Sequence, residues 1–318
     1  MMDLKLINEF TENEKINTPL LIKNVTKGVA NNGNPYLNVT FQDKTGTIEG
    51  KVWDAKGEMA QNFVAGYIGM VNAEVLKYRD NLQLKILGFD PVDQTKIKDM
   101  GRFVTISSIP LDELRKVVDS AISEIKDEVL HAIVTTIMNL VEKDFYEYPA
   151  ASKNHHEFVR GLATHVYGML RLANVLCDLY PELNRDLLYA GVILHDVGKI
   201  TELSGTVLTE YTMEGKLLGH ISIVQAMIYD VSKDLGYETS EQAVCLRHMV
   251  LSHHGEYEYG SPVLPMLKEA EILCYIDNID ARMNMFSKVM NDVEEGTFSP
   301  RVFSLENRSF YKPKFGNK

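Results

Sequence analysis

The stretch AGVILHDVGKI, residues 190–200, places His195 and Asp196 side by side after an apolar run. The run predicts the end of a buried helix that stops near Gly198. A neutral imidazole suits transition metals and a carboxylate can span two ions, so this pair is a fragment of a divalent-metal site. An HD dipeptide is common in proteins, and a site therefore needs further ligands from elsewhere in the chain.

Residues of suitable type lie on both sides of the pair, and most of the nine histidines fall within this part of the chain. The candidate ligands are His165, His195, Asp196, His220, His253, His254 and Asp277. Each histidine has an alternative role as a hydrogen-bonded core residue, which we favour for His131 and which the sequence leaves open for His248. Asp277 follows a strongly apolar run, and a buried carboxylate needs a cation or hydrogen bonds.

His253 and His254 are adjacent, and neighbouring residues on a helix diverge by about 100°. They would not readily share one ion in the middle of a helix. Gly255 follows at once and predicts a helix end, where the two rings have more freedom to reach a common site.

The elements that must position these residues are helical. Residues 107–144 predict one helix that begins near Pro110, with a stripe of apolar residues at helical spacing that we interpret as core. Beyond Pro149 the pattern stays helical and is interrupted at LSGT, at EYEYGSP and in the C-terminal tail.

The N-terminal part has a different pattern. Strands are predicted at 20–29, 36–42, 47–54, 69–76 and 82–87, with a short helix near 55–64. Three strands, a helix and two strands in about 70 residues predict an all-β OB-fold barrel.

One face of this barrel has the residue types that bind a nucleic-acid strand. Alternation along 36–53 predicts that Tyr36, Lys51 and Trp53 point outward, where an OB barrel lays its strand. Phosphate contacts nearby are expected from Lys23, Lys27, Lys44, Lys77 and Arg79. In the alternative interpretation these cations only solvate the strands and Trp53 packs against the linker. Acidic residues slightly outnumber basic ones in this region, which argues against a dedicated tight binder.

The whole chain has 318 residues and a formal net charge of −11. That charge argues against a generally basic nucleic-acid coat, although a local basic groove remains compatible with it. The three cysteines form no CxxC spacing, which favours free thiols. No apolar run approaches the roughly 20 residues that span a bilayer, so we expect no membrane segment and a cytoplasmic protein.

The order His165, His195-Asp196, Asp277 resembles the HD superfamily of metal-dependent phosphohydrolases, and the additional histidines resemble its two-metal branch. The predicted barrel followed by GLATH, GVILHDVGKI, LGH, HMVLSHHGEYEYGSP and ILCYIDNID is similar to the YhaM family of bacterial 3′-5′ exoribonucleases over nearly the whole chain. The GYP signature of cyclic-dinucleotide phosphodiesterases is replaced here by GEYEYGSP, which argues against that substrate.

The resemblance implies a ligand set for two ions. One ion would be held by His165, His195, Asp196 and Asp277, and the other by His220, His253 and His254, with Asp196 bridging and acting in catalysis. Lys199 is similar to a lysine that contacts substrate phosphate, its alternative being a surface lysine at a helix end. For His155 and His156 the resemblance favours contact with the RNA 3′ end. A histidine and carboxylate shell without thiolate suits Mn²⁺, with Co²⁺ and Fe²⁺ as alternatives.

The fold class expected is therefore a multidomain chain with an OB-fold barrel at 1–95, a linker and first helices at 96–148, an all-α HD-type phosphohydrolase core at 149–300 and a tail at 301–318. The function expected is a hydrolase, a 3′-5′ exoribonuclease that degrades single-stranded RNA, and also single-stranded DNA if the site tolerates it, to nucleoside 5′-monophosphates. The alternatives are an HD-type nucleotide or cyclic-nucleotide phosphohydrolase and a non-catalytic DNA- or RNA-binding regulator. A homo-oligomer is compatible with the sequence.

Overall fold

A computed structural model of the chain describes residues 4–30, 33–53, 61–93, 97, 100–151, 157–206 and 208–315. The chain divides into two compact units, Met1–Ile106 and Ser107–Lys318, and each has its own hydrophobic core. This division falls inside the segment predicted as linker and first helices. The finer boundaries expected at 95, 148 and 300 stay predictions.

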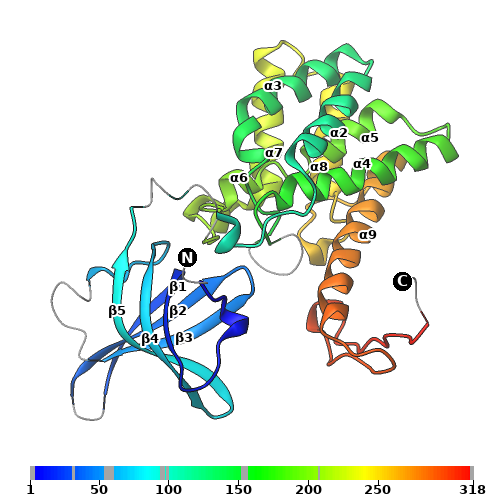
Figure 1. Cartoon of the computed structure of the whole chain (residues 1–318). Helices are drawn as coiled ribbons and strands as arrows, with labels where there is room; N and C mark the ends of the chain where they lie inside the picture. Colours follow the sequence, from blue (N-terminus) through cyan, green and yellow to red (C-terminus); the bar gives the residue numbers. More distant parts are fainter. Residues whose placement is uncertain are drawn as a thin grey trace. The chain divides into compact units, whose positions relative to one another are not determined.

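The first unit is a closed barrel whose strands follow the order β1, β2, β3, β5, β4 (Figure 1). The strands are β1 (Lys15–Val29), β2 (Pro35–Asp43), β3 (Gly46–Trp53), β4 (Ile68–Tyr78) and β5 (Asn81–Pro91). β1 pairs with β4 along its first half and with β2 along its second half, so this one long strand closes the sheet. β3 and β5 pair in parallel, and the other neighbours are antiparallel. The predicted OB-type barrel is confirmed.

The strands have the alternation that the sequence predicts. Leu37, Val39 and Phe41 of β2 are buried, as are Ile48 and Val52 of β3, and the residues between them on the other face are less buried or exposed. Asp43 and Gly50 lie on the buried face as well. Short 3₁₀ turns at Ile7–Glu9 (η1) and Met100–Arg102 (η3) flank the barrel. Most of the helix predicted at 55–64 lies outside the described residues.

The second unit is helical throughout its regular elements. Its longer helices are α2 (Leu111–Glu124), α3 (Glu128–Phe145), α4 (Gly161–Leu179), α5 (Arg185–Leu194), α7 (Met213–Asp234), α8 (Glu241–Ser252) and α9 (Lys268–Asn291). Shorter turns are α6 (Lys199–Glu202), η4 (Tyr257–Tyr259) and η5 (Phe303–Leu305). Side-chain N-caps begin several of these helices, as expected for Asp, Asn, Thr and Ser. The capping residues are Asp127, Asn184, Thr212 and Ser240.

The single helix predicted for 107–144 was wrong, because the structure has two helices there. The chain is extended at Ile125, and Asp127 caps α3 by accepting hydrogen bonds from the N–H groups of Val129 and Leu130. The carboxylate of Asp186 accepts the N–H groups of Lys126 and Asp127 at 2.8 and 2.7 Å. These bonds satisfy main-chain donors at the break, so the local cap outweighs the continuous apolar stripe.

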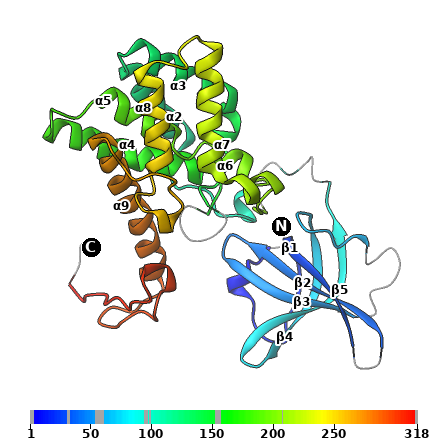
Figure 2. The ribbon, with the colours of Figure 1, turned by 180° about the vertical axis from the view of Figure 1, so that it is seen from behind.

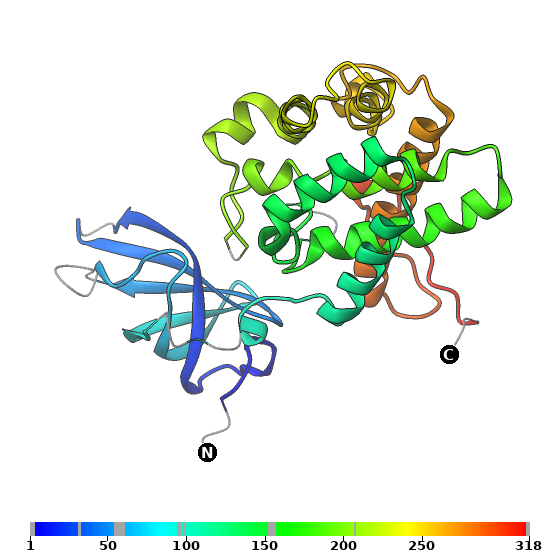
Figure 3. The same cartoon turned by 90° about the horizontal axis from the view of Figure 1, so that it is seen from above.

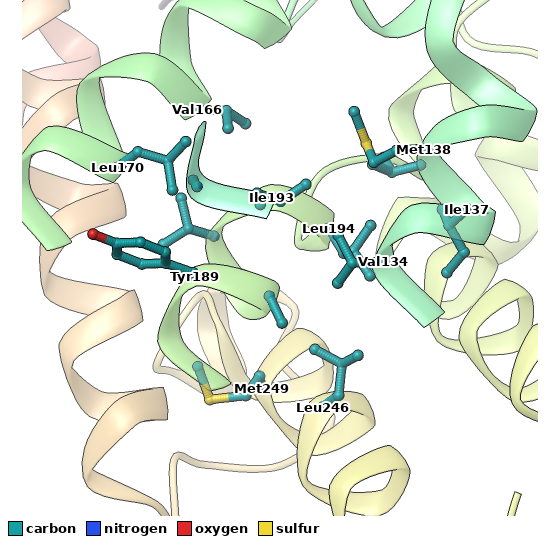
Figure 4. Close-up of a cluster of buried hydrophobic side chains, with 14 of the residues drawn as sticks. Val134, Ile137, Met138, Val166, Leu170, Tyr189, Ile193, Leu194, Leu246 and Met249 are labelled. Carbon is teal, nitrogen blue, oxygen red and sulfur yellow. The ribbon is translucent and has the colours of Figure 1, made fainter. Parts of the chain in front are cut away.

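α5 lies at the centre of the helical unit and packs against α3, α4, α8 and α9. Every residue from Leu187 to Leu194 is buried. Figure 4 shows Ile193 and Leu194 of α5 among Val134 of α3, Val166 of α4 and other apolar side chains. The helix that carries the HD pair is therefore held by apolar contacts around its full circumference, and its end is fixed in place.

Of the other ligand-bearing helices, α4, α8 and α9 pack against α5, and α7 packs against α8. α7 and α8 run side by side (Figure 2), and in Figure 3 α8 is seen nearly end-on whereas α4 lies in the plane of the picture. α9 packs against α4, α5 and α8. Among the described residues, none of the helices combines the length and apolar character that crossing a bilayer requires.

Candidate metal centre and strand-binding face

The candidate ligands come from five helices or their ends. His165 lies in α4, and His195 and Asp196 directly follow α5. His220 lies in α7 directly after a kink at Gly219, whose φ is 73°. His253 and His254 follow the last residue of α8, where Gly255 has φ of 78°, and Asp277 lies in α9. The helix end predicted at His253 and His254 is confirmed. The end predicted near Gly198 comes earlier, at Leu194, and Gly198 directly precedes α6.

The structure brings all seven of these residues together. Oδ1 of Asp196 lies 3.4 Å from Nε2 of His220 and 3.8 Å from Nε2 of His253. Its other oxygen, Oδ2, lies 3.3 Å from Nε2 of His195 and 3.9 Å from Nε2 of His165. The two oxygens of one carboxylate thus face different histidines.

Three sets of ligand atoms each converge to within 4.8 Å. These sets are His165, His195 and Asp277; His220, His253 and His254; and His195, Asp196 and His253. The first two sets share no residue, and Asp196 lies beside both, which is the arrangement that two neighbouring ions require.

Each histidine has its Nδ1 atom in a hydrogen bond. Nδ1 of His195, His253 and His254 lies 2.7–2.9 Å from a main-chain carbonyl oxygen. A carbonyl oxygen only accepts, so these Nδ1 atoms carry the proton, and in the neutral ring Nε2 has a free lone pair. The partners of the remaining two are carboxylates: Asp280 lies 2.7 Å from Nδ1 of His165, and Glu202 lies 3.2 Å from Nδ1 of His220.

Several of the converging atoms are buried and have no hydrogen-bond partner among the residues that the structure describes. They include Nε2 of His195, His220 and His253 and Oδ1 of Asp196. A buried polar atom without a partner costs about 1–3 kcal/mol. A divalent cation would satisfy imidazole nitrogens and a carboxylate oxygen at once, so this set of residues fits a metal ion.

The electrostatics of the site favour neutral rings at His253 and His254 and charged carboxylates at Asp196 and Asp277, whereas His165 without a cation favours the protonated ring. Burial lowers the pKa of His253 well below its usual value and also lowers the pKa of His254, which keeps both rings neutral. Burial raises the pKa of Asp196, but Lys199 and His195 more than offset it and hold the pKa well below the usual range. Burial also raises the pKa of Asp277, but the hydrogen bond and charge of His165 outweigh it and lower the pKa below its usual value. Burial works to lower the pKa of His165, but Asp277 and Asp280 raise it to about 10.

Lys199 is a buried residue, not a surface lysine at a helix end. Its Nζ donates a hydrogen bond to Oδ2 of Asp196 at 2.6 Å, and the residue is only 8% exposed. The ammonium therefore orients the carboxylate that lies between the two histidine sets. A contact between Lys199 and substrate phosphate stays a prediction.

Sequence reasoning missed Asp280 and Glu202. A signal for Asp280 was present, because it lies three residues after Asp277 on the same helix and so on the same face. Glu202 lies three residues after Lys199 in HDVGKITE, but nothing local marks it as a partner of His220, which follows 18 residues later.

The barrel presents a separate cluster of aromatic and basic side chains. Tyr36 and Trp53 are direct partners across β2 and β3, and their ring centroids lie 5.3 Å apart. Nζ of Lys51 lies 5.5 Å from the Tyr36 centroid and 5.4 Å from the Trp53 centroid. Trp53 is 50% exposed, and its described ring contact is with Tyr36 of the neighbouring strand. The exposed ring of Trp53, the half-buried ring of Tyr36 and the cation suit a stacked base and its phosphate.

The close packing of this cluster depends on Gly28. Gly28 is the partner of Tyr36 across β1 and β2, and a Cβ atom there would lie 2.4 Å from the tyrosine ring. Two further predicted substrate residues, His155 and His156, lie outside the described residues.

The chain is similar to a protein family, to an enzyme and to a solved domain. The HD domain family matches residues 162–282. The 3′-5′ exoribonuclease YhaM of Bacillus subtilis (strain 168) is 48% identical over 302 residues, which cover 95% of this chain and 96% of that protein. The solution NMR structure of the second OB-fold domain of replication protein A from Methanococcus maripaludis is 19% identical, with a TM-score of 0.24, and covers 28% of this chain and 95% of that domain.

Proposed function

The chain belongs to the YhaM family of 3′-5′ exoribonucleases, and from that premise we propose how its two units divide the work on RNA. The protein is a metal-dependent 3′-5′ exoribonuclease that combines an OB-type barrel with a helical HD domain. In our proposal the helical unit hydrolyses the terminal phosphodiester of a single strand and releases nucleoside 5′-monophosphates. The barrel holds the strand, and single-stranded DNA is a second substrate to be tested.

The observation that carries the proposal is the convergence of buried histidine nitrogens on Asp196. We assign one ion to His165, His195, Asp196 and Asp277, and the other to His220, His253, His254 and Asp196. Support comes from the two oxygens of Asp196, which face separate histidines. Mn²⁺ is the proposed ion because imidazole and carboxylate ligands without thiolate suit it.

When bound, such a pair of ions polarises the phosphodiester, lowers the pKa of a water molecule and stabilises the leaving oxygen. The role of the protein residues is to fix the orientation of the metal ligands. Lys199 fixes the orientation of Asp196 through its 2.6 Å hydrogen bond. Main-chain carbonyls of Val192, Val250 and Tyr259 fix three of the imidazole rings through Nδ1. We also propose that Lys199, His155 and His156 contact the 3′ end of the substrate.

The barrel face of Tyr36, Lys51 and Trp53 is the proposed strand-binding surface. Base stacking on aromatic side chains is tolerant of sequence, which suits an enzyme that must accept every nucleotide in turn. A cytoplasmic location is also part of the proposal, and the free thiols of Cys177, Cys245 and Cys274 are compatible with a reducing compartment.

An exonuclease of this kind needs a free, unpaired 3′ end. Each base-pair step of a duplex costs about 1.4 kcal/mol to open, a value for DNA that serves as a scale for RNA. The sequence contains no GxxxxGK[ST] loop that would couple ATP hydrolysis to unwinding. Digestion should therefore slow or stop shortly before a stable hairpin.

The test uses three RNAs of equal length with Mn²⁺: a 5′-labelled unstructured strand, a 3′-tailed hairpin and a circle. We expect a ladder that shortens from the 3′ end of the unstructured strand, a stop near the hairpin and an intact circle. Cleavage of the circle, or passage through the hairpin at the unstructured rate, would contradict the mechanism. Turnover of free nucleotides alone would favour a nucleotide phosphohydrolase, and binding without cleavage would favour a regulator.

A further inference from the structure

Two of the five histidines in the centre differ from the others in the partner of Nδ1. His195, His253 and His254 face main-chain carbonyls, whereas His165 faces Asp280 and His220 faces Glu202. The two carboxylate-backed histidines belong to different ligand sets. We propose that Asp280 and Glu202 are positioning residues, each of which sets the affinity of one of the two ions. This inference rests on the proposed two-ion site.

Asp280 holds His165 together with Asp277. Oδ2 of Asp280 lies 2.7 Å from Nδ1 of the imidazole, and Oδ1 of Asp277 lies 3.1 Å from Nε2. Both acids belong to α9 and lie three residues apart, so they share one face of the helix. The His165 ring is clamped at both nitrogens by a single turn of α9. Asp277 can turn to an ion at Nε2, and Asp280 then keeps the ring in place from the opposite side.

The chain leaves room for Asp280 by omitting a side chain at Gly168. Gly168 follows His165 by three residues in α4, and a Cβ atom there would lie 2.1 Å from Oδ1 of Asp280. That distance is far below van der Waals contact, so an alanine would displace the carboxylate. The approach of Asp280 on α9 to His165 therefore also depends on Gly168 of α4.

Glu202 fixes both the main chain and the ring of His220. Its Oε1 accepts a hydrogen bond from the His220 N–H at 3.0 Å and lies 3.2 Å from Nδ1 of the same residue. Glu202 is 8% exposed. These contacts occur directly after the kink at Gly219, where the second part of α7 begins. Glu202 thus sets the direction in which His220 leaves the kink.

A carboxylate that accepts the Nδ1 proton of a histidine ligand strengthens metal binding more than a main-chain carbonyl does. It accepts the Nδ1 proton, holds the tautomer that exposes the Nε2 lone pair and raises the basicity of that nitrogen. Loss of such a partner typically lowers metal affinity about 10–100-fold. Because Asp280 and Glu202 serve different ligand sets, each substitution should weaken one binding step and spare the other.

The experiment counts Mn²⁺ bound to the metal-free full-length chain by electron paramagnetic resonance of the free ion. The variants are Asp280→Asn and Asp280→Ala, and Glu202→Gln and Glu202→Ala. Asn and Gln keep an acceptor oxygen and the shape of the side chain, so these variants retain the fold and the losses should be graded, with Ala the larger. Gly168→Ala keeps the Asp280 carboxylate but displaces it. Exposed acids on the same or adjoining helices provide matched controls, Glu271→Gln on α9 and Glu214→Gln on α7.

We expect two binding steps in the parent. Asp280→Asn and Gly168→Ala should weaken the same step about tenfold or more, Glu202→Gln should weaken the other step, and the controls should change neither. Two unchanged steps in the Asn and Gln variants would overturn the positioning roles and leave the two-ion site standing. A uniform loss of both steps that follows the melting temperature would show a merely structural role and would also overturn them. A parent chain that binds one ion would overturn the two-ion proposal and this inference with it.

Discussion

Each unit of the molecule buries a carboxylate, and the two carboxylates have different surroundings. In the barrel, Asp43 is 2% exposed and accepts hydrogen bonds from the N–H groups of Ile7 and Thr45, both at 2.7 Å, and from the Thr45 hydroxyl. In the helical unit, Asp196 is also 2% exposed, but within the described part of the chain its Oδ1 has no hydrogen-bond partner and faces the imidazoles of His220 and His253. Protein donors satisfy Asp43, which serves the fold, whereas Asp196 accepts a hydrogen bond from Lys199 at Oδ2 and leaves Oδ1 available for a cation.

The same contrast extends to the two proposed substrate sites. On the barrel, the proposed strand-binding residue Trp53 is exposed, as stacking on an open ring face requires. In the helical unit, the proposed metal ligands His165, His195 and His253 are fully buried, which suits fixed ligand directions. Substrate binding and hydrolysis should therefore respond to different substitutions.

The largest effect expected is loss of hydrolysis in Asp196→Ala. Removal of the carboxylate that faces both ligand sets should lower kcat at least about a thousandfold, since bound ions contribute several kcal/mol to the transition state. Affinity for RNA, measured by fluorescence anisotropy, should stay within about twofold because the barrel is unchanged. Circular dichroism provides the check on folding. Activity within tenfold of the parent would remove the two-ion assignment.

Removal of metal should lower the melting temperature of the helical unit but not that of the barrel. An ion that binds only the folded state stabilises it by about 2.7 kcal/mol at a concentration of 100 times Kd. Chelation should therefore lower the melting temperature of the helical unit by roughly 5–10 °C and leave the barrel unchanged. Trp53 is the only tryptophan in the chain, so its fluorescence reports on the barrel while the helical signal in circular dichroism reports on the other unit. Equal shifts in both signals would contradict the separation.

Asp43→Ala should give the opposite result to Asp196→Ala. Loss of its hydrogen bonds should destabilise the barrel by about 2–3 kcal/mol. The fluorescence melting transition should move to lower temperature, while cleavage of a dinucleotide by the helical unit should keep the parent rate. Slow dinucleotide cleavage in a folded Asp43→Ala protein would show that the two units are not independent.

Trp53→Ala should have the smallest of these effects. Loss of one stacking partner costs about 1–3 kcal/mol of RNA affinity. The variant should bind a long oligonucleotide about 5- to 150-fold more weakly and cleave a dinucleotide at the parent rate. Tyr67→Ala, which removes another exposed aromatic side chain of the first unit, is the matched control. Equal losses in Trp53→Ala and Tyr67→Ala would show that Trp53 has no special role.

Local rules predicted the features that depend on residue type and spacing. Alternation identified the buried face of β2, and Gly255 identified the helix end that frees His253 and His254. The seven candidate ligands came from residue type, position and family resemblance. The break between α2 and α3 was not predicted, because apolar residues at helical spacing occur on both sides of it and the cap at Asp127 is a single local residue.

The sequence by itself determined which residues could bind metal, because imidazole and carboxylate are properties of the side chains. Only the tertiary structure decided which nitrogen of each histidine faces the site. His165 meets Asp280 across 115 positions of the chain, and His220 meets Glu202 across 18. Such contacts follow from the packing of the whole helical unit, since no local propensity of a segment specifies a partner so far away.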